Sequence, residues 1–252
     1  MARTGLFVYG FIRATEDRVT DVLGIDQGGA PGVVHIIADG GVGAVVSVGP
    51  GGDDKAMPSR KNLGSHNRVI QAFLAEITPM SFGQVVKGEA QIKKFMKKNR
   101  AAILAEIKRL DDKVEMSLRV RWDVENIFEY FMQADPELAE ARDRVFLDNP
   151  TPSHAEKVEL GRLFETRLGE VRTRETDQVL ASVERAVREV KVNVPKTDKT
   201  VMDIVVLVNR AGLPLFERKI HEVAEKFPDQ YAFEFTGPWA PFSFVELDLQ
   251  AA

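Results

Sequence analysis

Residues 233–249 read FEFTGPWAPFSFVELDL, an extended aromatic run that meets Gly237 and Pro238 and then continues as an apolar tail. Glycine and proline interrupt regular structure because one tolerates positive φ and the other fixes φ and lacks an N–H donor. The tail is too short and too charged to span a bilayer, which takes about 20 apolar residues. Since burying one large apolar side chain is worth roughly 1.5–3 kcal/mol, we expect the tail to pack on its own chain or on a partner. The candidate interdomain or partner contacts are Trp239, Phe242, Phe244 and Val245.

Working back from this tail, the second half of the chain predicts alternating strands and helices. Apolar residues alternate with polar ones in residues 113–122, which is typical of a half-buried strand. Helical spacing follows in 124–133, 137–145 and 153–189, then strands at 190–194 and 201–208, a helix at 215–226 and a strand at 231–236. This βαββαβ order predicts a modified ferredoxin-like fold with an extended helical insertion in its first crossover.

The first half predicts a smaller α+β domain. We expect a strand at 5–12, a charged segment and a Gly-rich loop up to residue 32, and two strands at 33–38 and 42–48. The turn Asp39-Gly40-Gly41 favours a hairpin, because a tight turn needs positive φ. After a loop at 49–62 we expect a helix beginning at an N-cap Ser65, a strand at 80–86 and an amphipathic helix at 88–110.

These elements predict an α+β protein of two domains and a tail. The period changes after Asp111, which places an N-terminal α+β domain in 1–111 and the ferredoxin-like domain in 112–236. The remaining residues, 237–252, are expected to pack between the two domains.

Composition excludes several classes of protein. The 252 residues carry a net charge of −4, so we expect no general nucleic-acid binding, and the absence of cysteine excludes disulfides and thiolate sites. The first residues, MARTGLFVYGFI, form too short an apolar stretch for a signal peptide, which predicts a cytoplasmic protein. The strand expected at 201–208, VMDIVVLV, has no aromatic residue on which RNA bases stack in proteins of this topology.

No catalytic, cofactor or metal site is predicted. His66 is the one histidine placed to act as a general base, and the alternative is a residue at the start of a helix, bonded to the backbone. None of the four histidines has metal-site spacing. Residues 49–55, GPGGDDK, put two carboxylates where a phosphate-binding loop would hold its phosphate, so we interpret them as a turn.

The helix expected at 88–110 has a basic outer face. Lys93, Lys94, Lys97 and Lys98 lie there within two turns. Such a face is either solvated or the docking surface of an acidic partner.

Four stretches together resemble the gas vesicle protein F/L family. They are LFVYGFI at 6–12, TPMSFGQVVKG at 78–88 after the predicted Ser65 helix, the strand from Lys113 with Glu115, and TGPWAPFSFV at 236–245. The resemblance implies a two-domain α+β protein whose C-terminal domain is ferredoxin-like. It also implies a non-enzymatic accessory or structural protein of gas vesicle assembly, cytoplasmic and associated with the vesicle, that binds the shell protein GvpA and other accessory proteins.

Two other functions remain open from the residues alone. A ferredoxin-like scaffold also suits a small-molecule-binding or transferase domain, because a fold does not fix a function. A regulatory module for an acidic protein is the third possibility, and it would use the four lysines of the basic face.

Overall fold

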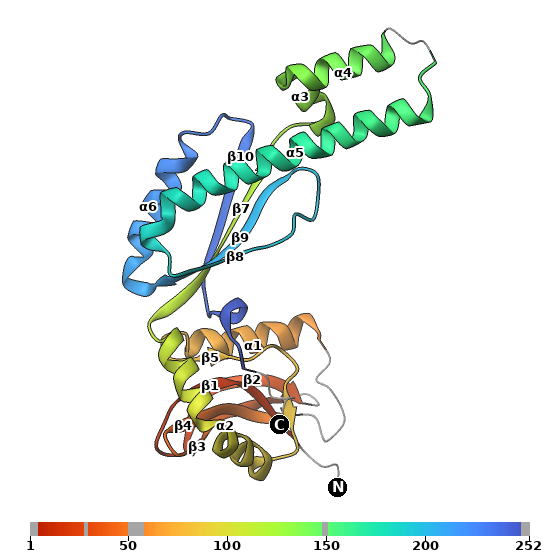
Figure 1. Cartoon of the computed structure of the whole chain (residues 1–252). Helices are drawn as coiled ribbons and strands as arrows, with labels where there is room; N and C mark the ends of the chain where they lie inside the picture. The colour runs from red at the N-terminus through yellow and green to blue at the C-terminus, as the bar shows by residue number, and fades with distance from the viewer. Residues whose placement is uncertain (1–4, 28–29, 50–57, 148–150, 248–252) are drawn as a thin grey trace. The chain divides into compact units, whose positions relative to one another are not determined.

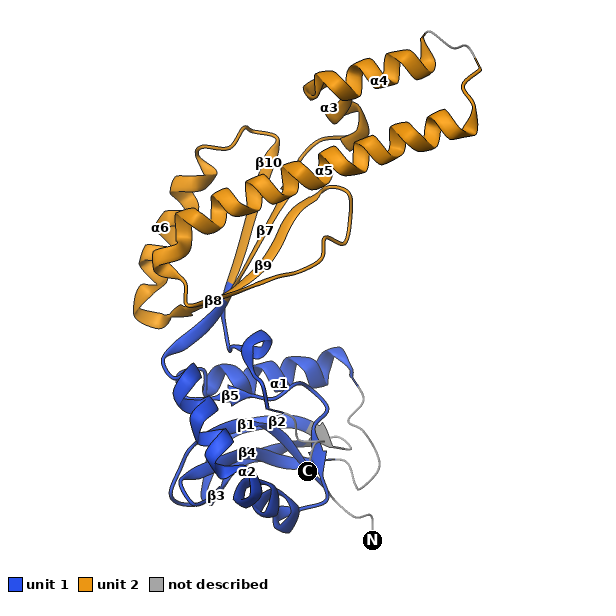
Figure 2. Cartoon of the chain, viewed as in Figure 1, with its two compact units in different colours: residues 1–115, 237–252 blue, residues 116–236 orange. Residues whose placement is uncertain are grey.

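A computed structural model describes residues 5–27, 30–49, 58–147 and 151–247, which form two compact units. Unit 1 comprises residues 1–115 and 237–252, and unit 2 comprises residues 116–236 (Figure 2). The chain therefore passes from one unit to the other a few residues after the predicted division at 111. The closing residues belong to unit 1, and their packing between the units stays a prediction.

Unit 1 is a twisted antiparallel sheet with one helix on each face (Figure 1). Its elements are β1 (Gly5–Arg13), β2 (Arg18–Gln27), β3 (Ala30–Asp39), β4 (Val42–Gly49), α1 (Arg60–Ala72), β5 (Thr78–Pro79), β6 (Val85–Val86) and α2 (Glu89–Leu110). The strands lie in the order β2-β3-β4-β1-β5, and β6 pairs with β1. Successive residues along each strand point to opposite faces of the sheet, so one set packs in a core with α1 and the other in a core with α2.

The predicted hairpin is confirmed. β3 and β4 pair from Val34 opposite Ser47 to Asp39 opposite Val42, and Gly40 and Gly41 have φ of 57° and 87°. Positive φ at both central residues is the requirement of the type I′ turn. The helix predicted at 88–110 is also confirmed as α2.

The predicted loop before residue 32 is wrong in its first part, because residues 18–27 form strand β2. Two register shifts in the pairing of β2 with β3 break the alternation that marks a strand in sequence. Gly24 serves close packing, since a Cβ there would lie 2.3 Å from the Tyr9 hydroxyl. Gly28, Gly29 and most of the phosphate-loop candidate lie outside the described residues.

The predicted start of α1 and the strand at 80–86 are also corrected. Ser59 is the N-cap of α1, where its hydroxyl accepts from the Asn62 N–H at 3.1 Å, and Ser65 is buried in the helix interior. The first turn of α1 is largely exposed to solvent, so the helical spacing of apolar residues in the sequence begins about one turn after the helix itself. Between the short strands β5 and β6 the chain turns at Gly83, where φ is 96°.

Unit 2 is a four-stranded sheet with helices on one face (Figure 1). Its elements are β7 (Lys113–Trp122, beginning in unit 1), α3 (Ile127–Ala134), α4 (Pro136–Phe146), α5 (His154–Val183), β8 (Glu189–Val192), β9 (Thr200–Asn209), α6 (Leu213–Ala224) and β10 (Tyr231–Trp239). Short 3₁₀ turns lie at Glu184–Ala186, Arg210–Gly212 and Phe242–Phe244. The element order agrees with the predicted one, and the strands lie in the order β10-β7-β9-β8.

The core of unit 2 lies between this sheet and helices α5 and α6. Alternate residues of β7, from Met116 to Trp122, are buried against it. The long helix is shorter than the predicted 153–189, because it begins after a capping box of Ser153 and Glu156 and ends at Val183. Helices α3 and α4 pack together, and α4 packs beside the first turns of α5 (Figure 1).

Candidate functional site

The segment that closes the chain is held in unit 1 by two buried carboxylates. Glu115 accepts hydrogen bonds from the backbone N–H and the hydroxyl of Ser243, at 2.7 and 2.9 Å. Glu106, on α2, accepts from the N–H of Glu246 at 2.8 Å and from Arg109 Nε at 2.9 Å. The segment therefore has backbone partners at two points, from a strand and from a helix of the same unit.

Arg109 completes this arrangement. Its guanidinium binds both oxygens of Glu106 and also donates to the carbonyl of Phe244. Burial raises the pKa of Glu106, but the hydrogen bonds from Arg109 and from the Glu246 N–H outweigh burial and hold the pKa below its usual value. The carboxylate thus stays charged and keeps the segment bound at neutral pH.

The predicted contact residues of the tail differ in their exposure. Phe244 is 1% exposed, whereas Trp239 is 44% exposed. Phe242 packs against the α1 core of unit 1, to which Ala240 also belongs, and Val245 is partly buried. Of the predicted contacts, Trp239 thus offers the most surface to a partner.

The predicted basic face splits into two groups. Lys93 lies 2.6 Å from Glu89 and 3.9 Å from Asp17, and its hydrogen bond with Glu89 holds its pKa above the usual value. Lys94, Lys97 and Lys98 are exposed and have no ion pair within the part of the chain that the structure describes. These three lysines are therefore surface cations of α2 that a partner can reach.

His66 has neither of the two predicted roles. It lies on the buried face of α1, 2% exposed, and both ring nitrogens lack a hydrogen-bond partner among the described residues. Four aromatic rings surround it with centroids 5.5–6.0 Å away, those of Phe7, Tyr9, Phe82 and Phe242. Burial lowers its pKa to about 4, so the ring is neutral at physiological pH. Without a partner to orient it or a path to solvent, it is a core residue.

An exposed row of aliphatic side chains crosses the sheet of unit 1, and sequence analysis did not find it. Leu23 pairs with Val33, and Leu6 pairs with Val48. The β3–β4 register, with Val34 opposite Ser47, places Val33 next to Val48. Leu23, Val33 and Val48 are 46%, 48% and 42% exposed. We call Leu6, Leu23, Val33 and Val48 the aliphatic row.

The aliphatic row lies on the α2 face of the sheet. In β4, Val42, Ala44 and Val46 pack in the α2 core, and Val48 continues the same alternation. Leu6 packs at the margin of that core. The residues of opposite parity, such as Val34 and Val45, pack with α1. Helix α2 and Leu247 of the closing segment therefore cover part of this face, and Leu23, Val33 and Val48 remain exposed.

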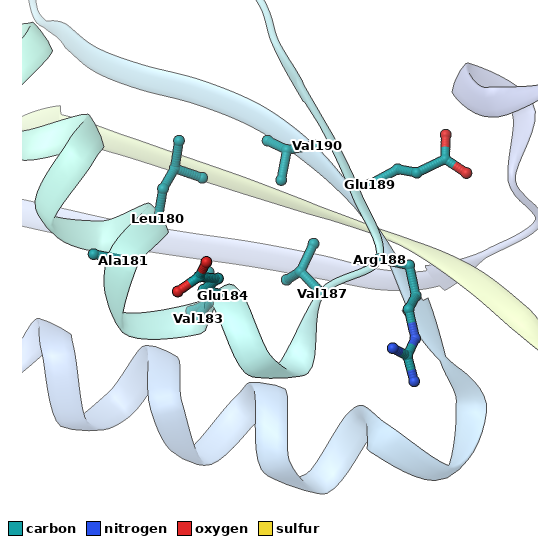
Figure 3. A pocket seen from close by; sticks show the side chains of 8 residues that line it. All are labelled: Leu180, Ala181, Val183, Glu184, Val187, Arg188, Glu189 and Val190. Carbon is teal, nitrogen blue, oxygen red and sulfur yellow. The ribbon is translucent and has the colours of Figure 1, made fainter.

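Unit 2 contains several cavities. One of them, of about 540 Å³, is lined by Tyr130, Tyr231, Arg167 and Arg174 among others. Among its charged groups, Arg167 lies 3.5 Å from Asp135 and also contacts Glu137. A second, of about 420 Å³, lies between the end of α5 and β8, with a mainly aliphatic lining (Figure 3).

Within 5–27, 30–49, 58–147 and 151–247, no three His, Asp or Glu side chains are grouped as metal ligands are. No helix of these ranges combines the length and apolarity needed to cross a membrane.

The family of the Gas vesicle synthesis protein GvpL/GvpF matches residues 5–246, nearly the whole sequence. The chain belongs to this family. A gas vesicle protein F from a Streptomyces species is 26% identical over 253 residues, which cover 95% of this chain and 99% of that protein. The gas vesicle protein F of Dolichospermum flosaquae is 22% identical over 200 residues, covering 77% and 81%. The crystal structure of the gas vesicle protein GvpF from Anabaena sp. has a TM-score of 0.83 at 20% identity, covering 97% of this chain and 99% of that one.

Membership of the GvpL/GvpF family confirms the resemblance inferred from the four sequence stretches. The protein has a gas vesicle accessory role and is not an enzyme. The mixed α+β fold is confirmed by its similarity to the GvpF crystal structure.

Proposed function

We propose that this GvpL/GvpF protein takes part in gas vesicle assembly by binding the shell protein GvpA and other accessory proteins through non-covalent contacts. The aliphatic row supports this proposal, because exposed apolar patches on soluble proteins mark interaction sites. We propose that the shell subunit, which the family resemblance implies is hydrophobic, binds this surface before it enters the shell. We place this activity in the cytoplasm, at the gas vesicle, with no lipid membrane or nucleic acid as partner.

Unit 2 is proposed to be the ferredoxin-like domain. Its element order is strand, helices, strand, strand, helix, strand, and its sheet order β10-β7-β9-β8 has the first and third strands at the centre. Helices α3 and α4 and the first turns of α5 form the added part of the first crossover. We propose a scaffold role for this unit, since Arg167 of its 540 Å³ cavity pairs with Asp135 and Glu137 of the same lining.

Co-purification of the tagged full chain with GvpA, at low and at high salt, tests the proposed function. We expect GvpA to be retained at both salt concentrations, because apolar contacts are not screened by ions. Loss of GvpA only at high salt would indicate that the lysines of α2 make the contact. No retention of GvpA or of any accessory protein at either concentration would refute the proposal. A small-molecule screen against unit 2 would then be the next experiment.

A further inference from the structure

Unit 1 has two exposed features on and beside the α2 face of its sheet, one aliphatic and one charged. The aliphatic row offers Leu23, Val33 and Val48, each between 42% and 48% exposed, on three adjacent strands. Val19, on the same strand as Leu23, is 77% exposed and pairs with His35, which lies on the same face. The exposed apolar area therefore extends from the edge strand β2 to the middle of the sheet.

The sheet edge beside this area is poorly suited to a further strand. β2 is the edge strand, and its pairing with β3 shifts register twice, between Val19 and Leu23 and between Leu23 and Asp26. Such irregularities interrupt the regular row of backbone groups that strand addition uses. The α2 face of the sheet, in contrast, already holds one helix, because α2 packs there through Ile92, Phe95 and Met96. A second helix is thus the element that fits beside α2.

The charge on α2 indicates the polar side of that partner. Lys93 is neutralised by Glu89 and Asp17, and Arg100 by Asp39 at the β3–β4 turn. Lys94, Lys97 and Lys98 remain exposed within about one turn of helix. A complementary surface therefore carries carboxylates.

We propose that the α2 face of unit 1 binds an amphipathic helix of a partner protein. Aliphatic residues at helical spacing on that helix would pack on Leu23, Val33 and Val48, and carboxylates on its flank would approach Lys94, Lys97 and Lys98. This recognition corresponds to the binding of an amphipathic helix by its apolar face. The inference rests on the proposed function, since it names the surface that binds a gas vesicle protein.

The first test uses the double variant Leu23→Thr, Val33→Thr of the full chain, co-purified with GvpA. Threonine keeps the β-branched shape that strands favour but replaces aliphatic surface by a hydroxyl. The matched control is Val190→Thr, Val192→Thr, which changes two exposed valines of β8 in unit 2, 39% and 59% exposed. We expect the row variant to retain GvpA at least about tenfold less well, because two aliphatic contacts are lost. The control is expected to bind like the wild type.

Equal retention by the row variant and the wild type overturns the inference and leaves the proposed function standing. Failure of the wild type to retain GvpA overturns the proposed function itself. Circular dichroism and urea unfolding establish that each variant is folded. If the double variant does not fold, the single variant Val48→Thr replaces it, with an expected loss of about threefold because one aliphatic contact is lost.

The second test asks whether the partner element is a helix with acidic flanks. The probe is a fluorescent peptide of about 18 residues, five turns long, with leucine at helical spacing and glutamate on both flanks. A peptide of the same composition with alternating leucine and glutamate, the pattern of a strand, is the control. We expect the wild-type chain to bind the helical peptide at least about tenfold more tightly in fluorescence anisotropy, since only its leucines lie on one helical face.

Charge is tested with the same helical peptide. Lys94→Gln, Lys97→Gln, Lys98→Gln should weaken binding severalfold at low salt and reduce the salt dependence, because the removed charges no longer attract the glutamates. Tighter binding of the alternating peptide, or an unchanged affinity of both the row variant and the lysine variant, overturns the inference.

Discussion

Replacing His66 by leucine tests how the interior of unit 1 is built. The imidazole is 2% exposed among aromatic rings, and neither ring nitrogen has a partner among the described residues. Leucine is apolar and close in volume, so it removes two unpaired polar atoms from the core. An unsatisfied buried polar group costs about 1–3 kcal/mol, and we therefore expect His66→Leu to be more stable than the wild type at pH 7.5.

The pH dependence of the free energy of unfolding gives a second expected value for His66. The pKa of His66 is about 4 in the folded protein, against about 6.5 for an unfolded histidine. Between these values the unfolded chain binds a proton that the folded chain does not, so stability falls as pH falls from about 6.5 to about 4. One unit of pKa corresponds to 1.36 kcal/mol, and the full loss is therefore about 3 kcal/mol.

Urea unfolding followed by circular dichroism, repeated from pH 7.5 to pH 4, measures this loss. The carboxylates of the protein also titrate in this range, but they are common to both chains and cancel in the difference. We expect the stability difference between His66→Leu and the wild type to widen by about 3 kcal/mol as pH falls. His154→Leu, which removes an exposed histidine at the start of α5, provides the baseline. A difference between His66→Leu and wild type that stays constant with pH would show that the imidazole is solvated or bonded in solution, and would refute the reasoning.

The remaining predictions concern the closing segment and the glycines. Glu115→Ala should lower the free energy of unfolding in urea by about 1.5–3 kcal/mol and expose the closing segment to proteases, because Ser243 loses its charged acceptor. Glu115→Gln should lower the free energy of unfolding by less. Equal losses of stability in the two variants would contradict a charge-assisted hydrogen bond. Gly24→Ala should destabilise the protein by about 1–3 kcal/mol, since its Cβ would meet the Tyr9 hydroxyl at 2.3 Å. Gly161→Ala in α5, where a Cβ meets nothing within 4 Å, should instead stabilise it by about 0.5–1 kcal/mol in thermal unfolding. The same sign for both glycine variants would contradict the packing argument.

Parts of the candidate site carried signals in the sequence, and others did not. The lysines of α2 were found because a helix of 22 residues displays its period clearly. Glu106 carried a signal that went unused, since it lies on the apolar stripe of α2 between Ile103 and Ile107. The aliphatic row had no such signal, because its residues come from separate strands and their exposure depends on how much of the sheet α2 covers.

The sequence by itself determined the elements whose patterns are local and regular. These are the β3–β4 hairpin with its two glycines, helix α2, and the strand and helix order of unit 2. Only the tertiary structure decided that β2 is a strand, that His66 is buried and that Glu106 and Glu115 hold the closing segment. The physical reason is range: a turn or an amphipathic helix is specified by neighbours within a few residues. The hydrogen bond that the Ser243 N–H donates to Glu115, in contrast, joins residues 128 positions apart, and no local sequence pattern predicts it.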